Sequence, residues 1–323
     1  MPTVAPLDLD AHCIAAAFIG ATPHFALADG AVHRLDDGHK IMRTNDGLLT
    51  AVPSQDGSRL LTAGEDGKVF AVAGDAVEQL ADLGRKWIGA LAAGPQGAVA
   101  YASGRNAYVR FADGKVRELS HPRTVEGLAF APKGMRLAVA RYNGATLHFP
   151  ATAGAPVELT WAGAHNAVTF SPDGNFLVTA MQENALHGWK LADGKHMRMS
   201  GYPAKVKSLS WSVKGKWLAS SGAPAAIVWP FSSKDGPMGK APLELGTRGN
   251  TVVTCVACHP AEEIVAVGYE DGMVLAARMA DSKEVLLRRS GKGAVSALGW
   301  DREGRRLAFG GAEGECGVID ISA

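Results

Sequence analysis

Residues 167–189, AVTFSPDGNFLVTAMQENALHGW, contain three short apolar segments separated by two turns. Val168 and Phe170 alternate with polar or small residues, which is typical of a β-strand with one buried face. The sequence Ser-Pro-Asp-Gly at 171–174 predicts a turn into a second strand that begins at Phe176. Because three short antiparallel strands cannot bury their own apolar faces, the stretch predicts a unit that stacks on copies of itself.

Seven other segments of the chain align with this stretch in the same register. The turns that anchor the alignment lie at 54–57, 94–97, 131–134, 171–174, 212–215, 259–262 and 301–304, and an abbreviated first copy covers 14–35. The copies start near residues 12, 48, 88, 125, 166, 206, 252 and 295. The 323 residues therefore divide into eight copies of about 40 residues, which is the period of a four-stranded propeller blade.

Each copy has a middle segment rich in Ala, Ser, Thr and Gly, and its third segment ends at the position of Trp189. This pattern resembles the WD40-repeat family of β-propellers over essentially the whole chain. The Trp-Asp pair that names the family is replaced by Trp189-Lys190 and by Trp229-Pro230, and its Gly-His pair by Gly163-Ala-His165. The resemblance implies that His165, Thr179 and Trp189 belong to a hydrogen-bonded set within one blade, with Gln182-Glu183 where the family has Asp.

The predicted fold is all-β: one domain, residues 1–323, forming a closed β-propeller of four-stranded antiparallel blades. We expect eight blades, with seven as the alternative. The last copy stops after its third strand, and residues 3–9 read as a short strand that can supply the fourth. Pairing between the two ends would close the ring and remove an exposed sheet edge.

Composition narrows the function classes. A formal net charge of +1 gives no general signal for nucleic acid or for an anionic membrane surface. The first ten residues, MPTVAPLDLD, lack the pattern of a secretory signal, and no run reaches 18 apolar residues. We therefore expect a monomeric cytoplasmic protein that does not associate with membranes and whose four cysteines are thiols.

Cys255-Val-Ala-Cys258-His259 has the spacing of a c-type haem attachment site. The segment aligns with a first strand and its turn, where two cysteines three residues apart point to opposite faces. We expect an ordinary strand and turn here, with haem or a thiolate metal site as the minor alternative. Ten histidines scatter through the copies without a metal-binding pair, and most Asp residues beside Gly suit turns. The sequence thus predicts no cofactor, no metal and no catalytic residues.

The loops just before each first strand offer a better candidate site, because a ring brings them to one face. Residues that these loops and the neighbouring turns place there are Arg85, Lys86, Trp87, Arg123, Tyr142, His165, Lys205, Lys207, Arg248 and Lys292, with Trp161 and Tyr202 as further aromatic residues. Arg and aromatic side chains are frequent anchors of protein interfaces. We expect a non-catalytic scaffold that binds a protein or peptide on this face, with an acidic partner as one option. The alternative is an enzyme or small-ligand receptor that uses the central pocket, and a third interpretation is a solvated face whose opposite charges pair locally.

Overall fold

The computed structural model describes residues 6–36 and 38–322, which form antiparallel strands and one 3₁₀ turn but no α-helix. The chain has two compact units: unit 1 comprises Met1–Ala28, Val32–Ile41 and Gly201–Ala323, and unit 2 comprises Asp29–Ala31 and Met42–Ser200. The single domain expected from the sequence stays a prediction.

Unit 1 contains three four-stranded sheets and most of a fourth, whose strands β4 and β5 extend into unit 2. The shared sheet is β2 (Cys13–Ile19), β3 (Thr22–Leu27), β4 (Ala31–Leu35) and β5 (His39–Arg43). The next two sheets are β20 (Leu209–Trp211), β21 (Trp217–Ser220), β22 (Ala226–Pro230), β23 (Leu243–Leu245), and β24 (Val253–Cys258), β25 (Ile264–Tyr269), β26 (Val274–Arg278), β27 (Glu284–Arg288). The last is β28 (Val295–Trp300), β29 (Arg306–Gly311), β30 (Glu315–Asp320) and β1 (Leu7–Asp8).

Unit 2 contains two four-stranded sheets and one six-stranded sheet. The four-stranded sheets are β6 (Leu48–Pro53), β7 (Leu60–Gly64), β8 (Lys68–Ala73), β9 (Ala76–Asp82), and β10 (Ala90–Ala93), β11 (Val99–Ser103), β12 (Asn106–Arg110), β13 (Val116–Ser120), with the 3₁₀ turn η1 (Pro95–Gly97) after β10. The six-stranded sheet is β14 (Val125–Phe130), β15 (Leu137–His148), β16 (Val157–Phe170), β17 (Phe176–Met181), β18 (Ala185–Lys190) and β19 (His196–Met199).

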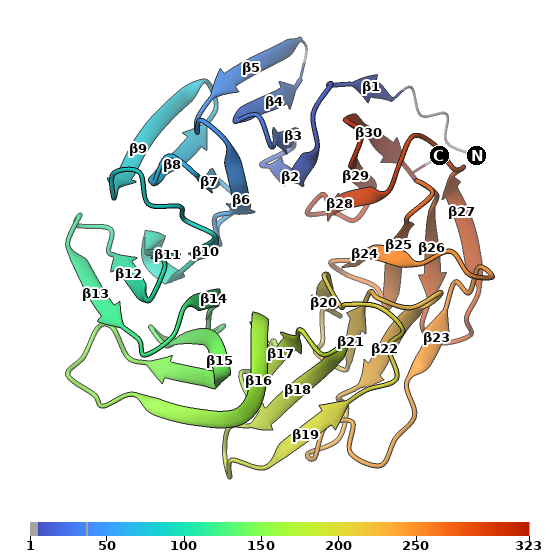
Figure 1. Cartoon of the computed structure of the whole chain (residues 1–323). Helices are drawn as coiled ribbons and strands as arrows, with labels where there is room; N and C mark the ends of the chain where they lie inside the picture. The colour runs from blue at the N-terminus through green and yellow to red at the C-terminus, as the bar shows by residue number, and fades with distance from the viewer. Residues whose placement is uncertain (1–5, 37, 323) are drawn as a thin grey trace. The chain divides into compact units, whose positions relative to one another are not determined.

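Four-stranded antiparallel blades are confirmed, but the prediction of eight is wrong, because the described residues form seven sheets. The difference arises in the copies that start near 125 and 166, which share the six-stranded sheet of β14 to β19 (Figure 1). Here β16 runs from one copy into the next: its first part pairs with β15 and its second part, after a register shift at 165–167, pairs with β17. Since β16 continues where a loop would separate two blades, the hydrogen-bond ladder passes from one copy into the next.

The last sheet is completed by the N-terminal strand, as predicted. Leu7 pairs with Cys316 and Asp8 with Glu315, so β1 lies antiparallel to β30, the third strand of the last copy (Figure 1). The Leu9 amide extends this pairing by donating to the Gly314 carbonyl at 2.9 Å. Residues 3–5 of the predicted strand lie outside the described residues, and ring closure stays a prediction.

The turn at 171–174 shows how the repeated motif forms a blade. The Gly174 amide donates to the Ser171 carbonyl at 2.8 Å, and Gly174 has a φ of 75°, which favours glycine. The Ser171 hydroxyl accepts the Phe176 amide at 2.9 Å, so it also fixes the start of β17. The motif thus sets both the reversal and the register of the two strands.

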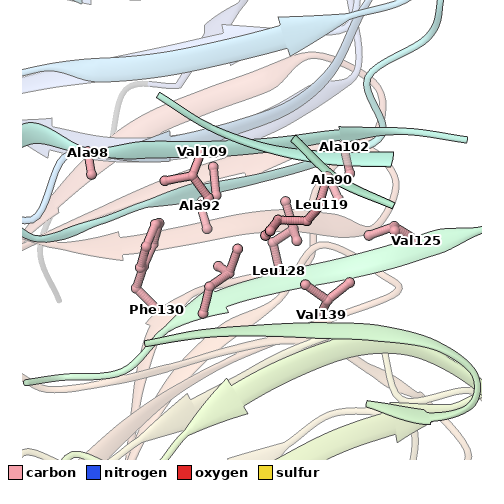
Figure 2. Close-up of a cluster of buried hydrophobic side chains, with 13 residues drawn as sticks. Ala90, Ala92, Ala98, Ala102, Val109, Leu119, Val125, Leu128, Phe130 and Val139 are labelled. Carbon is pink, nitrogen blue, oxygen red and sulfur yellow. The ribbon is translucent and has the colours of Figure 1, made fainter. Parts of the chain in front are cut away.

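The core lies between the faces of neighbouring sheets. In unit 2, Phe130 and Leu128 of β14 and Val139 of β15 pack against Ala92 and Val109 of the preceding sheet (Figure 2). Small residues such as Ala92 let the two sheets approach closely, and the Phe130 ring fills the space that remains between them. Such packing holds the strand ends firmly, which positions the loops considered next.

Candidate functional site

The loop before β10 presents Arg85, Lys86 and Trp87 to solvent. All three are exposed, and 63% of the Trp87 surface remains accessible, although indole is among the side chains that gain most from burial. The next residue, Ile88, is fully buried and anchors the loop.

Backbone hydrogen bonds fix this loop to the turn between β7 and β8. The Leu83 amide donates to the Gly67 carbonyl at 2.9 Å, and the Ile88 amide donates to the Gly64 carbonyl at 3.0 Å. A Cβ on Gly67 would lie 1.7 Å from the Gly84 carbonyl oxygen, so the two backbones approach as closely as glycine allows. The indole is therefore exposed on a firmly held loop.

A recess of about 490 Å³ lies beside Trp87. Its lining residues are Asp46, Glu65, Asp66, Lys68, Asp82, Gly84, Arg85 and Trp87. Four carboxylates thus face two cationic side chains and one indole, although the sequence analysis emphasised the basic residues of this loop. The acidic residues come from the preceding loop, the turn after β7 and the end of β9.

A buried polar network supports the recess from below. The Thr62 hydroxyl donates to the side-chain oxygen of Asn45 at 2.9 Å. The side-chain nitrogen of Asn45 donates to the Asp66 carboxylate at 2.9 Å and to the Lys68 backbone carbonyl at 3.0 Å. Asp66 also accepts the Asp46 and Lys68 amides at 3.3 and 3.1 Å. Thr62 and Asn45 are buried, so this network holds the loop ahead of β6 onto the turn after β7.

Tyr142 is exposed at a second firmly held position, with 49% of its surface accessible. The buried Arg141 guanidinium donates to the Tyr142 carbonyl at 3.0 Å and to the Thr146 hydroxyl at 3.3 Å, and it forms an ion pair with Glu158. Asn143 has a φ of 68°, as expected where β15 turns tightly. Arg141 therefore fixes the backbone beneath an exposed phenol ring. Arg123, in the loop before β14, is also exposed.

His165 does not belong to a surface site. The structure places it fully buried, with one ring nitrogen 2.7 Å from the Thr179 hydroxyl and the other 3.1 Å from the Trp161 carbonyl. Burial lowers the pKa of His165, which keeps the ring neutral near pH 7. His165 is therefore absent from the exposed surface at which the sequence placed it. The pairing with Thr179 that the family resemblance implied is present, and the ring lies 5.7 Å from that of Trp189.

Tyr202, in unit 1, is also buried and hydrogen-bonded within its sheet. Its hydroxyl lies 2.7 Å from the Ser220 hydroxyl and accepts the Trp229 indole N–H at 2.6 Å. Burial raises the pKa of Tyr202 to about 12. The ring serves the interior of its sheet and cannot anchor a partner.

The remaining predicted residues of unit 1 differ in how far they are free to bind. Lys292 forms an ion pair with Asp8 at 2.7 Å, which raises the pKa of the ammonium group, and Arg248 forms one with Glu284. Lys205 is half-buried and Lys207 is exposed. Local pairing of opposite charges, the third interpretation of the sequence, thus holds for Arg248 and Lys292.

The Cys-x-x-Cys-His segment forms the predicted strand and turn. Cys255 and Cys258 lie on β24 in different hydrophobic clusters, as expected for opposite faces, and burial raises their pKa values to about 11 and 12. His259 Nε2 hydrogen-bonds the Gly304 carbonyl at 2.9 Å, and its Nδ1 accepts the Ala261 amide at 3.1 Å. Both ring nitrogens therefore already stabilise the turn.

Within residues 6–36 and 38–322, no group of three or more His, Cys, Asp or Glu side chains is placed to hold a metal ion. A second recess of unit 2, about 590 Å³, lies between the turns after β6 and β10. Neither recess has a histidine or cysteine among its described lining residues. The same part of the chain contains no helix with the length and apolar character needed to cross a membrane.

Repeated four-stranded antiparallel blades define the class of the molecule, a β-propeller protein. The family model described as anaphase-promoting complex subunit 4 WD40 domain matches residues 256–323. This match and the blades support the WD40-repeat propeller family. The crystal structure of the computationally designed Ika8 protein is 19% identical to this chain, covers 97% of it and 98% of its own length, and superposes with a TM-score of 0.78. That likeness concerns the fold alone. No curated protein matches the chain.

Proposed function

We propose that the protein is a non-catalytic scaffold that binds a partner protein or peptide through the exposed loops of unit 2 around Trp87 and Tyr142. A WD40-type propeller is in general a platform for protein interaction, which supports the class of function. The observation that carries the proposal is the exposure of two large aromatic side chains on loops whose backbones are firmly held. Rigid aromatic residues give large contact area at little cost in conformational entropy, and they are enriched among interface hot spots.

Exposed cationic groups extend this surface. Arg85, Lys86 and Arg123 are exposed, and none of them forms an ion pair with another described residue. They can contact acidic side chains of the partner, as the sequence predicts. That the protein acts as a monomer and in the cytoplasm stays part of this proposal.

The test compares partner capture by four forms of the full chain from the native cell. The double variant Trp87→Ala/Tyr142→Ala removes both aromatic anchors, and the triple variant Arg85→Glu/Lys86→Glu/Arg123→Glu reverses the cationic groups. Val116→Ala, which truncates an exposed side chain on the outer strand β13, is the matched control for the wild type.

We expect specific partners to be captured by the wild type and by Val116→Ala, to be lost from the aromatic variant, and to bind the charge-reversed variant more weakly. Each exposed aromatic anchor contributes about 2 kcal/mol, or roughly 30-fold in affinity. Circular dichroism and thermal unfolding verify that every variant is folded. Identical capture by all four forms would contradict the proposal.

A further inference from the structure

The recess beside Trp87 is negatively charged, although the loop that borders it carries Arg85 and Lys86. Its four carboxylates exceed its two cationic side chains, Lys68 and Arg85, by two charges. The carboxylates come from three segments, 46, 65–66 and 82, which the sheet of β6 to β9 brings together. Opposite charge on a ligand would lower the repulsion among them.

Two of these carboxylates are available to a ligand. Asp66 is committed to Asn45 and to two backbone amides, and Asp82 accepts the Gly84 amide at 2.8 Å. Asp46 and Glu65 are exposed, and neither side chain forms an ion pair with any residue that the structure describes. They can therefore pair with a cation without breaking a bond of the fold.

Trp87 gives the recess a second, independent preference. The face of an indole attracts cations, and a guanidinium group can also stack on it. Because Trp87 lies on a loop fixed at both ends, its backbone is held beside the recess before a ligand arrives. A volume of about 490 Å³ lies near the lower end of the range for ligand pockets, which suits one long side chain.

A bare metal ion fits less well. Asp66 is occupied, Lys68 and Arg85 would repel a small divalent cation, and an indole adds nothing to its coordination. An organic cation can use the indole and the carboxylates together while its stem covers apolar surface.

We propose that this recess binds an arginine or lysine side chain of the partner. The inference rests on the proposed function and adds to it: the partner offers acidic groups to Arg85, Lys86 and Arg123 and one basic side chain to the recess.

The test uses the full chain labelled with ¹⁵N at its tryptophan indoles and a titration with acetyl-Gly-Gly-Arg-Gly-Gly-amide. Trp87→Phe identifies the Trp87 signal among the seven tryptophans. Peptides with citrulline or glutamate in place of arginine are the matched ligands, since citrulline keeps the shape and removes the charge. We expect saturable movement of the Trp87 signal with the arginine peptide, about tenfold weaker binding of the citrulline peptide, and none of the glutamate peptide.

Variants of the recess then assign the charge. Asp46→Asn/Glu65→Gln should weaken the arginine peptide about tenfold, and Arg85→Ala should strengthen it by removing repulsion. Glu126→Gln, at an exposed position of β14 outside the recess lining, should bind as the wild type does. Equal binding of the arginine and citrulline peptides, or wild-type binding by Asp46→Asn/Glu65→Gln, would overturn the inference.

Failure of this inference differs from failure of the proposed function. If the peptide does not bind but Trp87→Ala/Tyr142→Ala still fails to capture the partner, the scaffold proposal stands and the inference of a basic side chain in the recess is wrong. If the peptide binds and partner capture does not depend on Trp87 or Tyr142, the recess is a cation site and the scaffold proposal is wrong.

Discussion

We expect acid to destabilise the protein well above the pH at which carboxylates titrate, because several histidines are buried in neutral form and two of them, His187 and His121, have strongly lowered pKa values. His187, on β18, is fully buried, stacks on Trp161 at 4.1 Å between ring centres and meets the edge of Trp189 at 4.6 Å. Neither of its ring nitrogens has a hydrogen-bond partner among the described residues. Burial, reinforced by the nearby charges of His165, His196 and Arg198, lowers the pKa of His187 to about 3.

His121, just after β13, is the second such group. It is buried, and its ring meets that of His148 edge-on at 5.0 Å. Burial, followed by the charges of His148 and Arg141, lowers the pKa of His121 to about 4.

The sign and size follow from linkage. Both histidines titrate near pH 6.5 in the unfolded chain, so below that pH the unfolded state binds protons that the folded state excludes. Their contribution to stability is complete above pH 6.5 and falls by about 1.4 kcal/mol per pH unit for each histidine until the folded pKa is reached. At pH 4.5 the loss of stability from each histidine should be about 2.5 kcal/mol. Carboxylates such as Asp56, whose pKa of about 2 reflects hydrogen bonds from Ser54 and Ser58, lose stability only below about pH 4.

Urea unfolding at pH 7.0, 5.5 and 4.5, followed by tryptophan fluorescence, measures this slope. His187→Phe and His121→Phe keep an aromatic ring and remove the titrating group, so each should reduce the slope by about one proton, whatever packing change it causes at pH 7. His12→Gln, at an exposed position, is the control and should keep the wild-type slope. If the double variant His187→Phe/His121→Phe loses stability between pH 6.5 and 4.5 as steeply as the wild type does, these two histidines are not the cause of the acid destabilisation.

Two further predictions concern the interior. Asn45→Ala should lower the free energy of unfolding by about 2–3 kcal/mol, because it leaves Thr62 and Asp66 without their buried partner. The control Asn166→Ala removes a more exposed hydrogen bond to Gln182 and should lower it by less than about 1 kcal/mol. Equal losses of the two variants in urea unfolding would refute the role of the network. Gly310→Ala should also destabilise the protein, since the new methyl group would lie 2.2 Å from the Cys13 sulfur, whereas the control Gly89→Ala meets no atom within 4 Å. In thermal unfolding, Cys13→Ala should restore part of the stability that Gly310→Ala loses. Additive effects of the two changes would refute the clash.

The repeat was predictable because each copy must solve the same problem with its own residues. The turn at 171–174 and its relatives fix the first two strands, and the truncated last copy requires a strand from elsewhere, which Leu7 and Asp8 supply. The number of sheets was not predictable, because nothing in residues 163–165 indicates whether the strand ends there or continues into the next copy.

The site was predictable only in part. A loop position before the first strand correctly placed Trp87 and Arg123 at the surface, but it is shared by His165 and Tyr202, which are buried. Loop position fixes the backbone, whereas burial of a side chain depends on a partner on the following strand. The recess was missed because its carboxylates come from three separate segments. Thr62 and Ser220, which align with Thr179, were the signal that each loop holds a buried polar partner.

The chemistry of that partner differs between copies, but in each of three copies it bonds a hydroxyl of the second strand. Asn45 bonds Thr62, His165 bonds Thr179, and Tyr202 bonds Ser220. Each connects the loop before a first strand to the middle strand of the same copy, so the loop is stabilised from within and its outer residues carry none of that structural load. The loop of Trp87 is held by backbone hydrogen bonds and the backbone of Tyr142 by Arg141, so substitution of either exposed side chain should change what the surface binds without breaking those bonds. Such a separation allows a fixed framework to evolve new partners, and it makes exposed loop residues better evidence for function here than the regular blade around Trp189.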